Sequence, residues 1–362
     1  MSAQLRTASN TIKLAREENP KMRERDLAQQ LGISEAEFIE AWLGDGVTKI
    51  GVNLDSFFTM LRDAGPVMAL SRNAGAVHEK TGVYENYRSS KHASMLVGPE
   101  IDLRIFPQHW QHAYHVSKLL NNGDEQNSFQ FFDTHGRAVH KVYALPQTDM
   151  AVWHQIMNGL VVSDPMPGVF KPIDPYRERS ATIPASSLSR LHREWSDLQD
   201  THSFAPMLRR LKIGRLDAIR FIGKDYATRL APEAVEQLLG ALSTMALPVM
   251  VFVRNPGILQ IHSGPVKNIK KIGPWLNVLD EGFHCHLRVD QIDTAWIVRK
   301  PAKRGDIYSV ELFDQFGEQI MLINGFRREG DQSPDLEAWN QQIQSLPQKE
   351  METPNAYSSA NF

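Results

Sequence analysis

Apolar residues recur every three to four positions in three stretches of the chain, residues 24–43, 205–213 and 231–245. This spacing puts the apolar side chains on one face of a helix, so each stretch is predicted to form amphipathic helices. One set lies early in the first half of the chain and the other lies early in the second half.

Shorter apolar runs follow the helical stretches in both halves. Phe132–Gly136 and Phe313–Gly317, which read FDTHG and FDQFG, are typical of hairpin turns between strands. Helices followed by a series of strands predict an α+β fold with antiparallel sheets. The predicted strand regions are 66–75, 101–107, 113–118, 128–145, 248–257, 283–289, 294–300 and 307–325.

The two halves of the chain repeat each other. VMALSRNAG at 67–75 and VMVFVRNPG at 249–257 agree at five of nine positions, and Arg72 and Arg254 are 182 residues apart. The same offset aligns Lys118 with Lys300. A match of this length indicates an internal duplication, and two copies favour a pair of similar domains over a solenoid.

Proline and small polar residues mark the boundary between the copies. We predict an N-terminal repeat at 1–160, a linker at 161–189, a C-terminal repeat at 190–345 and a flexible tail at 346–362.

The composition is that of an ordinary globular protein of 362 residues, with 42% apolar residues and a net charge of −2. This charge argues against a protein whose main task is to coat nucleic acid. The single cysteine, Cys285, excludes an intramolecular disulfide and favours a reducing compartment. No secretory signal or apolar run of membrane-spanning length is evident, so we expect a cytoplasmic protein.

A histidine stands at a predicted helix start within WSDLQDTHSFAPMLRRLKIGR, residues 195–215. Asp200, Thr201 and Ser203 around His202 are all helix N-cap types. In the first copy Met22 aligns with His202, so the histidine is not part of the shared scaffold. An imidazole close to several cations suits an iron-containing molecule with two carboxylates, such as haem. The alternative is a capping histidine next to a solvated basic face, Arg209, Arg210, Lys212 and Arg215.

Other histidine clusters have structural explanations. His109, His112 and His115 are expected on a turn and a strand, where a spacing of three alternates faces. His284 and His286 are expected on one strand face with Cys285 opposite, but the sequence shows no third ligand for zinc.

Residues 23–42 resemble a helix-turn-helix, with Gly32 in the turn and Ser34 capping the second helix. This alternative would make the protein a DNA-binding regulator. The second helix carries three glutamates and no base-reading Arg, Asn or Gln, so phosphate repulsion disfavours it. We expect the first helical layer of the N-terminal repeat instead, and we do not expect nucleic acid as a partner.

Four long segments resemble the HemS/ChuS/HmuS family of cytoplasmic haem-binding and haem-degrading proteins. They read WSDLQDTHSFAPMLRRLKIGRLDAIR, RNAGAVHEKTGVYENY, DLRIFPQHW and VRNPGILQIHSGPVKNIKKIGPWLNVLDEGFHCHLRVDQIDTAWIVRKP. The resemblance implies two repeats, each with a large antiparallel sheet and a helical layer, the sheets being stacked centrally. It places haem in a cleft between helices and sheet of the C-terminal half.

The resemblance also implies roles for individual residues. His202 of the DTH motif would be the proximal iron ligand, and Arg104 of the DLR motif would approach the iron from the distal side as the catalytic residue. Arg215 and Lys300 would contact the haem propionates. His78 corresponds to a second haem site described for some members.

The sequence departs from the family near its last strand. Members often carry Gln and Tyr there as further propionate contacts, where this chain has Leu322 and Asn324. Haem would therefore be held less tightly, or tilted.

Two activities follow from the resemblance, and both support iron acquisition in a haem uptake system. The protein would degrade haem, or it would act as a chaperone that delivers haem to a separate haem oxygenase. No flavin or nicotinamide fingerprint is evident, so degradation would need an external electron donor. The expected partners are haem, a haem oxygenase or reductase, and an inner-membrane haem transporter, without stable membrane insertion of this chain.

Overall fold

The computed structural model describes residues 3–120, 122–163, 165–172, 183, 185–327 and 334–350. The chain divides into two compact units. The first unit contains Met1–Arg72, Val77–Asp174 and Arg254–Gln260, and the second contains Asn73–Ala76, Pro175–Val253 and Ile261–Phe362.

The first unit is built on antiparallel strands in the order β1-β7-β8-β9-β2-β3, with a second ribbon in the order β4-β5-β6. Its strands are β1 (Val47–Ile50), β2 (Val67–Arg72), β3 (Ala76–Gly82), β4 (Tyr87–Arg88), β5 (Ser94–Val97), β6 (Asp102–Ile105), β7 (His112–Leu119), β8 (Glu125–Phe132) and β9 (Ala138–Ala144). Its helices are α1 (Ala3–Glu18), α2 (Glu24–Gln30), α3 (Glu35–Glu40), α4 (Leu54–Leu61) and α5 (Met150–Leu160), with 3₁₀ turns η1 (Arg62–Ala64) and η2 (Pro107–His109).

The second unit repeats this plan, with the orders β10-β16-β17-β18-β11-β12 and β13-β14-β15. Its strands are β10 (Ala227–Leu230), β11 (Pro248–Asn255), β12 (Ile258–Pro265), β13 (Ile269–Ile272), β14 (Trp275–Asp280), β15 (Phe283–Arg288), β16 (Thr294–Lys300), β17 (Ile307–Phe313) and β18 (Gln319–Gly325). Its helices are α6 (Ala185–Ser196), α7 (Phe204–Leu211), α8 (Arg215–Phe221), α9 (Ala234–Met245) and α10 (Pro334–Gln344), with 3₁₀ turns η3 (Thr201–Ser203) and η4 (Val289–Gln291).

The strand registers confirm the duplication. Met95 lies opposite Arg104 in the first unit, and Asn277 lies opposite His286 in the second, each pair 182 residues from its counterpart. The antiparallel strands and the helices of both units confirm the predicted α+β class.

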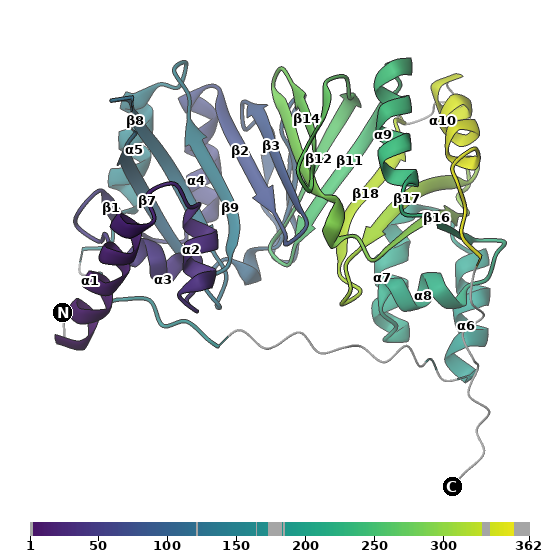
Figure 1. Cartoon of the computed structure of the whole chain (residues 1–362), viewed down its shortest axis with the longest axis horizontal. Helices are drawn as coiled ribbons and strands as arrows, with labels where there is room; N and C mark the ends of the chain where they lie inside the picture. Colours follow the sequence, from purple (N-terminus) through teal and green to yellow (C-terminus); the bar gives the residue numbers. More distant parts are fainter. Residues whose placement is uncertain are drawn as a thin grey trace, which may run out of the picture. The chain divides into compact units, whose positions relative to one another are not determined.

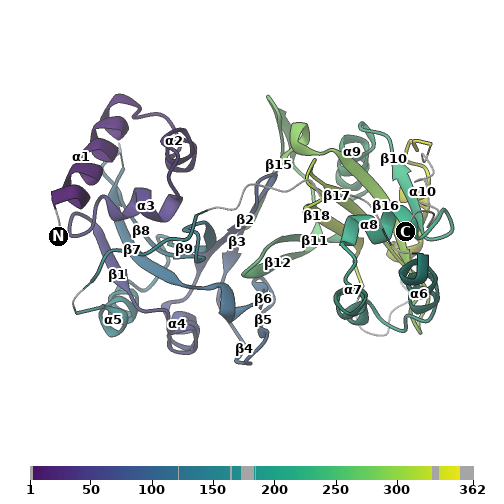
Figure 2. The same ribbon diagram turned by 90° about the horizontal axis from the view of Figure 1, so that it is seen from below.

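Each sheet has helices on both faces (Figures 1 and 2). In the second unit, alternate strand residues such as Val251 and Ile323 pack under α9 and α10. Trp296 and Phe313 point to the other face, where they pack with Phe204 and the rest of the α6–α8 layer. Because side chains alternate along a strand, this second face can carry a separate set of polar residues beneath α7 and α8.

Two predicted boundaries differ from the structure. Helix α6 begins at Ala185, within the predicted linker. Residues 346–350 were predicted to start a flexible tail, but Ala231 N donates to the Pro347 carbonyl at 2.9 Å and Lys349 N donates to the Arg229 carbonyl at 3.0 Å. Backbone pairing with the β10 region therefore holds this segment. The rest of the predicted tail, 351–362, and linker residues 164, 173–182 and 184 lie outside the described residues.

The predicted hairpin turn after β8 is confirmed and offers a stability test. Gly136 has φ +72°, and a Cβ there would lie 2.2 Å from Ser34 Oγ, which caps helix α3. We expect Gly136→Ala to lower the free energy of unfolding by about 3 kcal/mol, because left-handed strain adds to the loss of the cap. Gly123 has φ +89° and open space around it, so Gly123→Ala should cost only about 1 kcal/mol. Equal losses in urea denaturation would contradict the role of Ser34.

Candidate functional site

His202 lies on the exposed turn η3, directly before helix α7. The capping group is Asp200, whose Oδ1 accepts hydrogen bonds from Ser203 N at 2.9 Å and Ser203 Oγ at 3.2 Å. The Ser203 backbone N–H is the main cause that holds the pKa of Asp200 below its usual range. The imidazole is therefore not the cap. It lines a hollow of about 600 Å³ together with Leu198, Pro206 and other residues of the α6–α7 region.

Arg215 and Lys300 meet at one buried carboxylate, Glu311. Arg215 binds it through two bonds, Nε to Oε2 at 2.5 Å and Nη2 to Oε1 at 2.8 Å. Lys300 Nζ donates to Oε1 at 2.6 Å. Ser309 Oγ also donates to Oε1, at 3.0 Å, and Gln319 Nε2 donates to Oε2 at 2.9 Å. The carboxylate is thus the centre of a fully bonded polar network, which we call the Glu311 network.

The local fold explains why these residues converge. Arg215 is the first residue of α8, Lys300 is the last residue of β16, and Glu311 lies in β17 on the face beneath α7 and α8. The ring of Phe204 completes the site, with Arg215 Cζ at 4.9 Å and Lys300 Nζ at 5.0 Å from its centroid. Both cations therefore combine an ion pair with a cation–π contact.

Burial and charge act in opposite directions within this network. Burial alone would raise the pKa of Glu311, but Arg215 and Lys300 together hold it well below its usual range. Burial lowers the pKa of Lys300 to about 8, although Glu311 counteracts this shift. Glu311 is therefore ionised at neutral pH, and Lys300 keeps its charge mainly because of Glu311.

No sequence motif singles out Glu311. Its only sequence signal is a lone charge within the apolar strand SVELF, residues 309–313. The basic residues of this segment also lie in different environments. Arg209, Arg210 and Lys212 are exposed, and Arg210 pairs with Glu194 at 2.5 Å. Of the basic residues from Arg209 to Arg215, only Arg215 joins the buried network.

Arg104 lies on β6 of the first unit, opposite Met95. It forms an ion pair with Asp102 and donates to the Leu103 carbonyl at 3.1 Å. Burial raises the pKa of Asp102, while Arg104 opposes this shift. The role of Arg104 toward iron remains a prediction.

Leu322 and Asn324 lie next to the Glu311 network on β18. Leu322 is opposite Glu311 and Asn324 is opposite Ser309, so both belong to the same sheet face. Two buried polar atoms on this face, Asn324 Oδ1 and Trp296 Nε1, have no hydrogen-bond partner among the described residues. Unsatisfied buried polar atoms are uncommon in folded proteins, so these two atoms set this face apart from an ordinary apolar core.

His78 is fully buried on β3, opposite Ser71. Its imidazole has no exposed surface that could contact an external ligand. A second haem site at His78 therefore stays a prediction.

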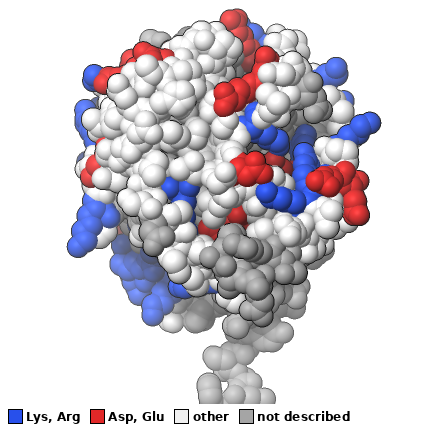
Figure 3. Space-filling view, turned by 90° about the vertical axis from the view of Figure 1, so that its left-hand side faces the viewer, with Lys and Arg blue, Asp and Glu red and all other residues white. Residues whose placement is uncertain are grey.

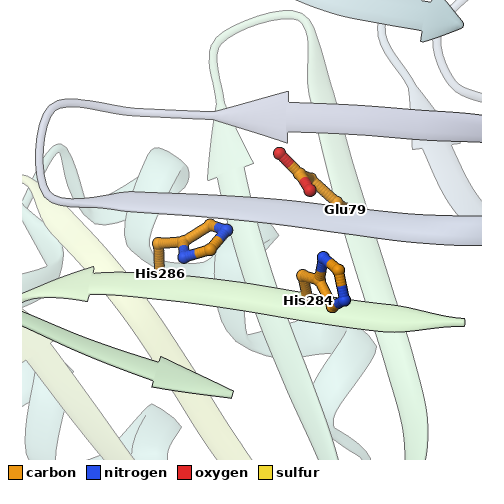
Figure 4. Close-up of side chains that lie close together, drawn as sticks. All are labelled: Glu79, His284 and His286. Carbon is orange, nitrogen blue, oxygen red and sulfur yellow. The ribbon is translucent and has the colours of Figure 1, made fainter. Parts of the chain in front are cut away.

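The remaining histidine patterns have the expected strand geometry. His112 lies against Phe170, with 4.6 Å between ring centroids, whereas His115 is buried and accepts a bond from Trp153 Nε1 at 3.0 Å. His284 and His286 project from β15 (Figure 4), and Cys285 between them is buried.

The glutamates of α3 serve the first unit internally. Glu35 accepts a bond from Lys141 at 3.0 Å, and Glu40 accepts one from Tyr114 Oη at 2.6 Å. Ser34 caps α3 as predicted, and Glu37 completes a capping box with it. Acidic and basic side chains are interspersed on the face of the first unit seen in Figure 3. These observations favour a helical layer over a DNA-reading helix, because a recognition helix needs base-reading side chains and phosphate contacts.

Comparison with known proteins supplies independent evidence. Residues 32–160 and 212–346 match the family described as the haemin-degrading HemS.ChuX domain. The hemin transport protein HmuS of Yersinia pestis is 33% identical over 338 residues, which cover 93% of this chain and 96% of that protein.

Two solved structures are similar over 95% of this chain and 99% of their own chains. Holo-PhuS, a heme-binding protein from Pseudomonas aeruginosa, has a TM-score of 0.88 at 32% identity. The heme-degrading enzyme ChuS of Escherichia coli O157:H7 has a TM-score of 0.86 at 30% identity.

Proposed function

Because the chain belongs to the haemin-degrading HemS/ChuX domain family, we propose that it binds haem on the α7–α8 side of the second unit. The Glu311 network carries this proposal. It brings two cations together in the same unit as His202, a partly exposed Arg215 with N–H donors to spare and a buried Lys300.

Each residue has a distinct task in this proposal. His202 would hold the haem iron through an imidazole nitrogen, which requires an accessible side chain. Arg215 and Lys300 bind the propionates, and so set the orientation of the ring. Asn324 and Trp296 fit the same ligand, because their buried polar atoms lie on this face and lack partners among the described residues. When bound, haem supplies the iron for redox chemistry.

Arg104 acts as the distal and catalytic residue in this proposal, as the family motif implies. A guanidinium can stabilise developing negative charge by hydrogen bonding.

We place the protein in the cytoplasmic part of a haem uptake pathway, where it receives haem from an inner-membrane transporter. In this proposal the protein degrades haem with electrons from a reductase. The alternative is that it delivers intact haem to a haem oxygenase. Among the helices that the structure describes, none combines the length and apolar character of a membrane span.

Titration of the purified protein with hemin tests the binding proposal. We expect the Soret band to saturate at one hemin per chain. With reductant, oxygen and catalase, degradation should yield a defined open-chain tetrapyrrole and free iron, and Arg104→Ala should slow it while binding persists. Bleaching that disappears with catalase, together with transfer of intact haem to an oxygenase, would assign the chaperone role instead. Hemin binding that never saturates would overturn the proposal.

A further inference from the structure

We propose that Glu311 is the positioning residue for propionate recognition: it orients Arg215, keeps Lys300 charged, and leaves the site with one net positive charge. This inference rests on the proposed function. Glu311 itself does not touch the ligand. It acts through the two cations that it binds.

The number of N–H groups on Arg215 and Lys300 exceeds the number that bind Glu311. One carboxylate can therefore position both cations and leave N–H groups for a ligand. Arg215 has five N–H groups, and the bonds to Glu311 use two of them. Lys300 has three, of which one binds Glu311 and one binds Ser309 Oγ at 3.0 Å. The side chain of Arg215 is 21% exposed, whereas that of Glu311 has no exposed surface. The side chain of Lys300 is only 4% exposed, so Arg215 is the accessible cation and Lys300 lies beneath it beside the carboxylate.

The electrostatics of the network support the same role. Four side chains pack around the Lys300 ammonium: Glu311 and Ser309 from β17, Arg215 from α8, and the Phe204 ring. Burial and Arg215 both disfavour the charged form of Lys300, and Glu311 opposes them. Removal of the carboxylate charge would therefore lower the pKa of Lys300 further, so the ligand would lose one of its cations at a lower pH than in the wild type.

The first unit lacks this arrangement at its equivalent positions. Gln130 and Lys141 of the first unit are equivalent to Glu311 and Leu322 of the second. In each unit the two residues lie opposite each other on neighbouring strands. Gln130 donates to Ser128 Oγ at 3.0 Å, and Lys141 pairs instead with helix residue Glu35. The acid is on the helix in the first unit and on the strand in the second. The shared scaffold therefore does not require Glu311, which favours a functional reason for its presence.

The test compares Glu311→Gln with wild type across pH 6–10. The probes are metal-free protoporphyrin IX and its dimethyl ester, which avoid titration of an iron-bound water. We expect Glu311→Gln to weaken protoporphyrin IX binding about tenfold at pH 8, because charge-assisted bonds are lost. The pH midpoint of binding should fall by about one unit or more, as Lys300 loses its counter-ion. The ester should show neither effect, and Glu311→Asp should restore most of the wild-type profile.

Glu35→Gln is the matched control, because it removes a partly buried carboxylate that pairs with Lys141 in the first unit. It should lower stability without moving the binding profile. Tighter binding of protoporphyrin IX by Glu311→Gln would show that Glu311 only repels the ligand, and an unchanged midpoint would show a merely structural role. Either result overturns the inference. Absence of saturable hemin binding by the wild type would instead overturn the proposed function, so the two failures are distinguishable.

Discussion

Substitution of His202 by alanine is expected to weaken hemin binding by about 100-fold or more and to change the Soret spectrum. Loss of an axial ligand should cost at least as much as loss of an outer-shell partner, which is typically worth 10–100-fold. The side chain of His202 is exposed, and the turn is capped by Asp200. The melting temperature of the free protein should therefore stay the same.

His192 provides the control for this experiment, since it is an exposed histidine on the neighbouring helix α6. His192→Ala should leave both affinity and spectrum unchanged. The measurement is a Soret titration of the three proteins, with thermal unfolding in parallel. Equal hemin affinity and identical spectra for wild type and His202→Ala would remove His202 from the site.

The second large effect is expected from Arg215→Met, which should lower the free energy of unfolding by about 3–5 kcal/mol. This is the usual cost when one partner of a buried ion pair is removed. Glu311 has no exposed side-chain surface and would lose its bidentate partner, which leaves Lys300 as its counter-ion. Lys300→Met leaves the bidentate pair intact, so it should cost roughly half of that loss or less.

The network also predicts how stability depends on pH. Arg215 and Lys300 hold the pKa of Glu311 below its unfolded value. A lowered carboxylate pKa contributes stability that is fully present above the unfolded pKa of about 4.5 and is lost as pH falls through the folded pKa. Arg215→Met should reduce this contribution, so its stability should decline less steeply below pH 4.5 than that of wild type.

Urea denaturation between pH 3 and pH 8 measures both effects on wild type, Arg215→Met and Lys300→Met. If the two variants lost equal stability at pH 7, the bidentate pair would not be the dominant contact of Glu311. Parallel acid profiles for wild type and Arg215→Met would show that Glu311 is not stabilised by its cations.

The duplication, the α+β class and part of the helices and strands could be predicted from the sequence alone. These features depend on local patterns, such as helical spacing in 231–245 and turn residues in Phe313–Gly317. Local residue types also sufficed to predict Ser34 as a helix N-cap. The position of His202 at a helix start was also predictable, because capping residues surround it.

The choice of which charged residues act together depends on the three-dimensional fold. Arg215 and Glu311 are 96 residues apart, and no local pattern links a helix start to the middle of a strand. Their pairing depends on strand order and on the sheet face that each residue occupies. For the same reason, the sequence could not show which of Arg210 and Arg215 belongs to the buried network. Both are basic residues in one short segment, but one lies in solvent and the other lies over a buried carboxylate.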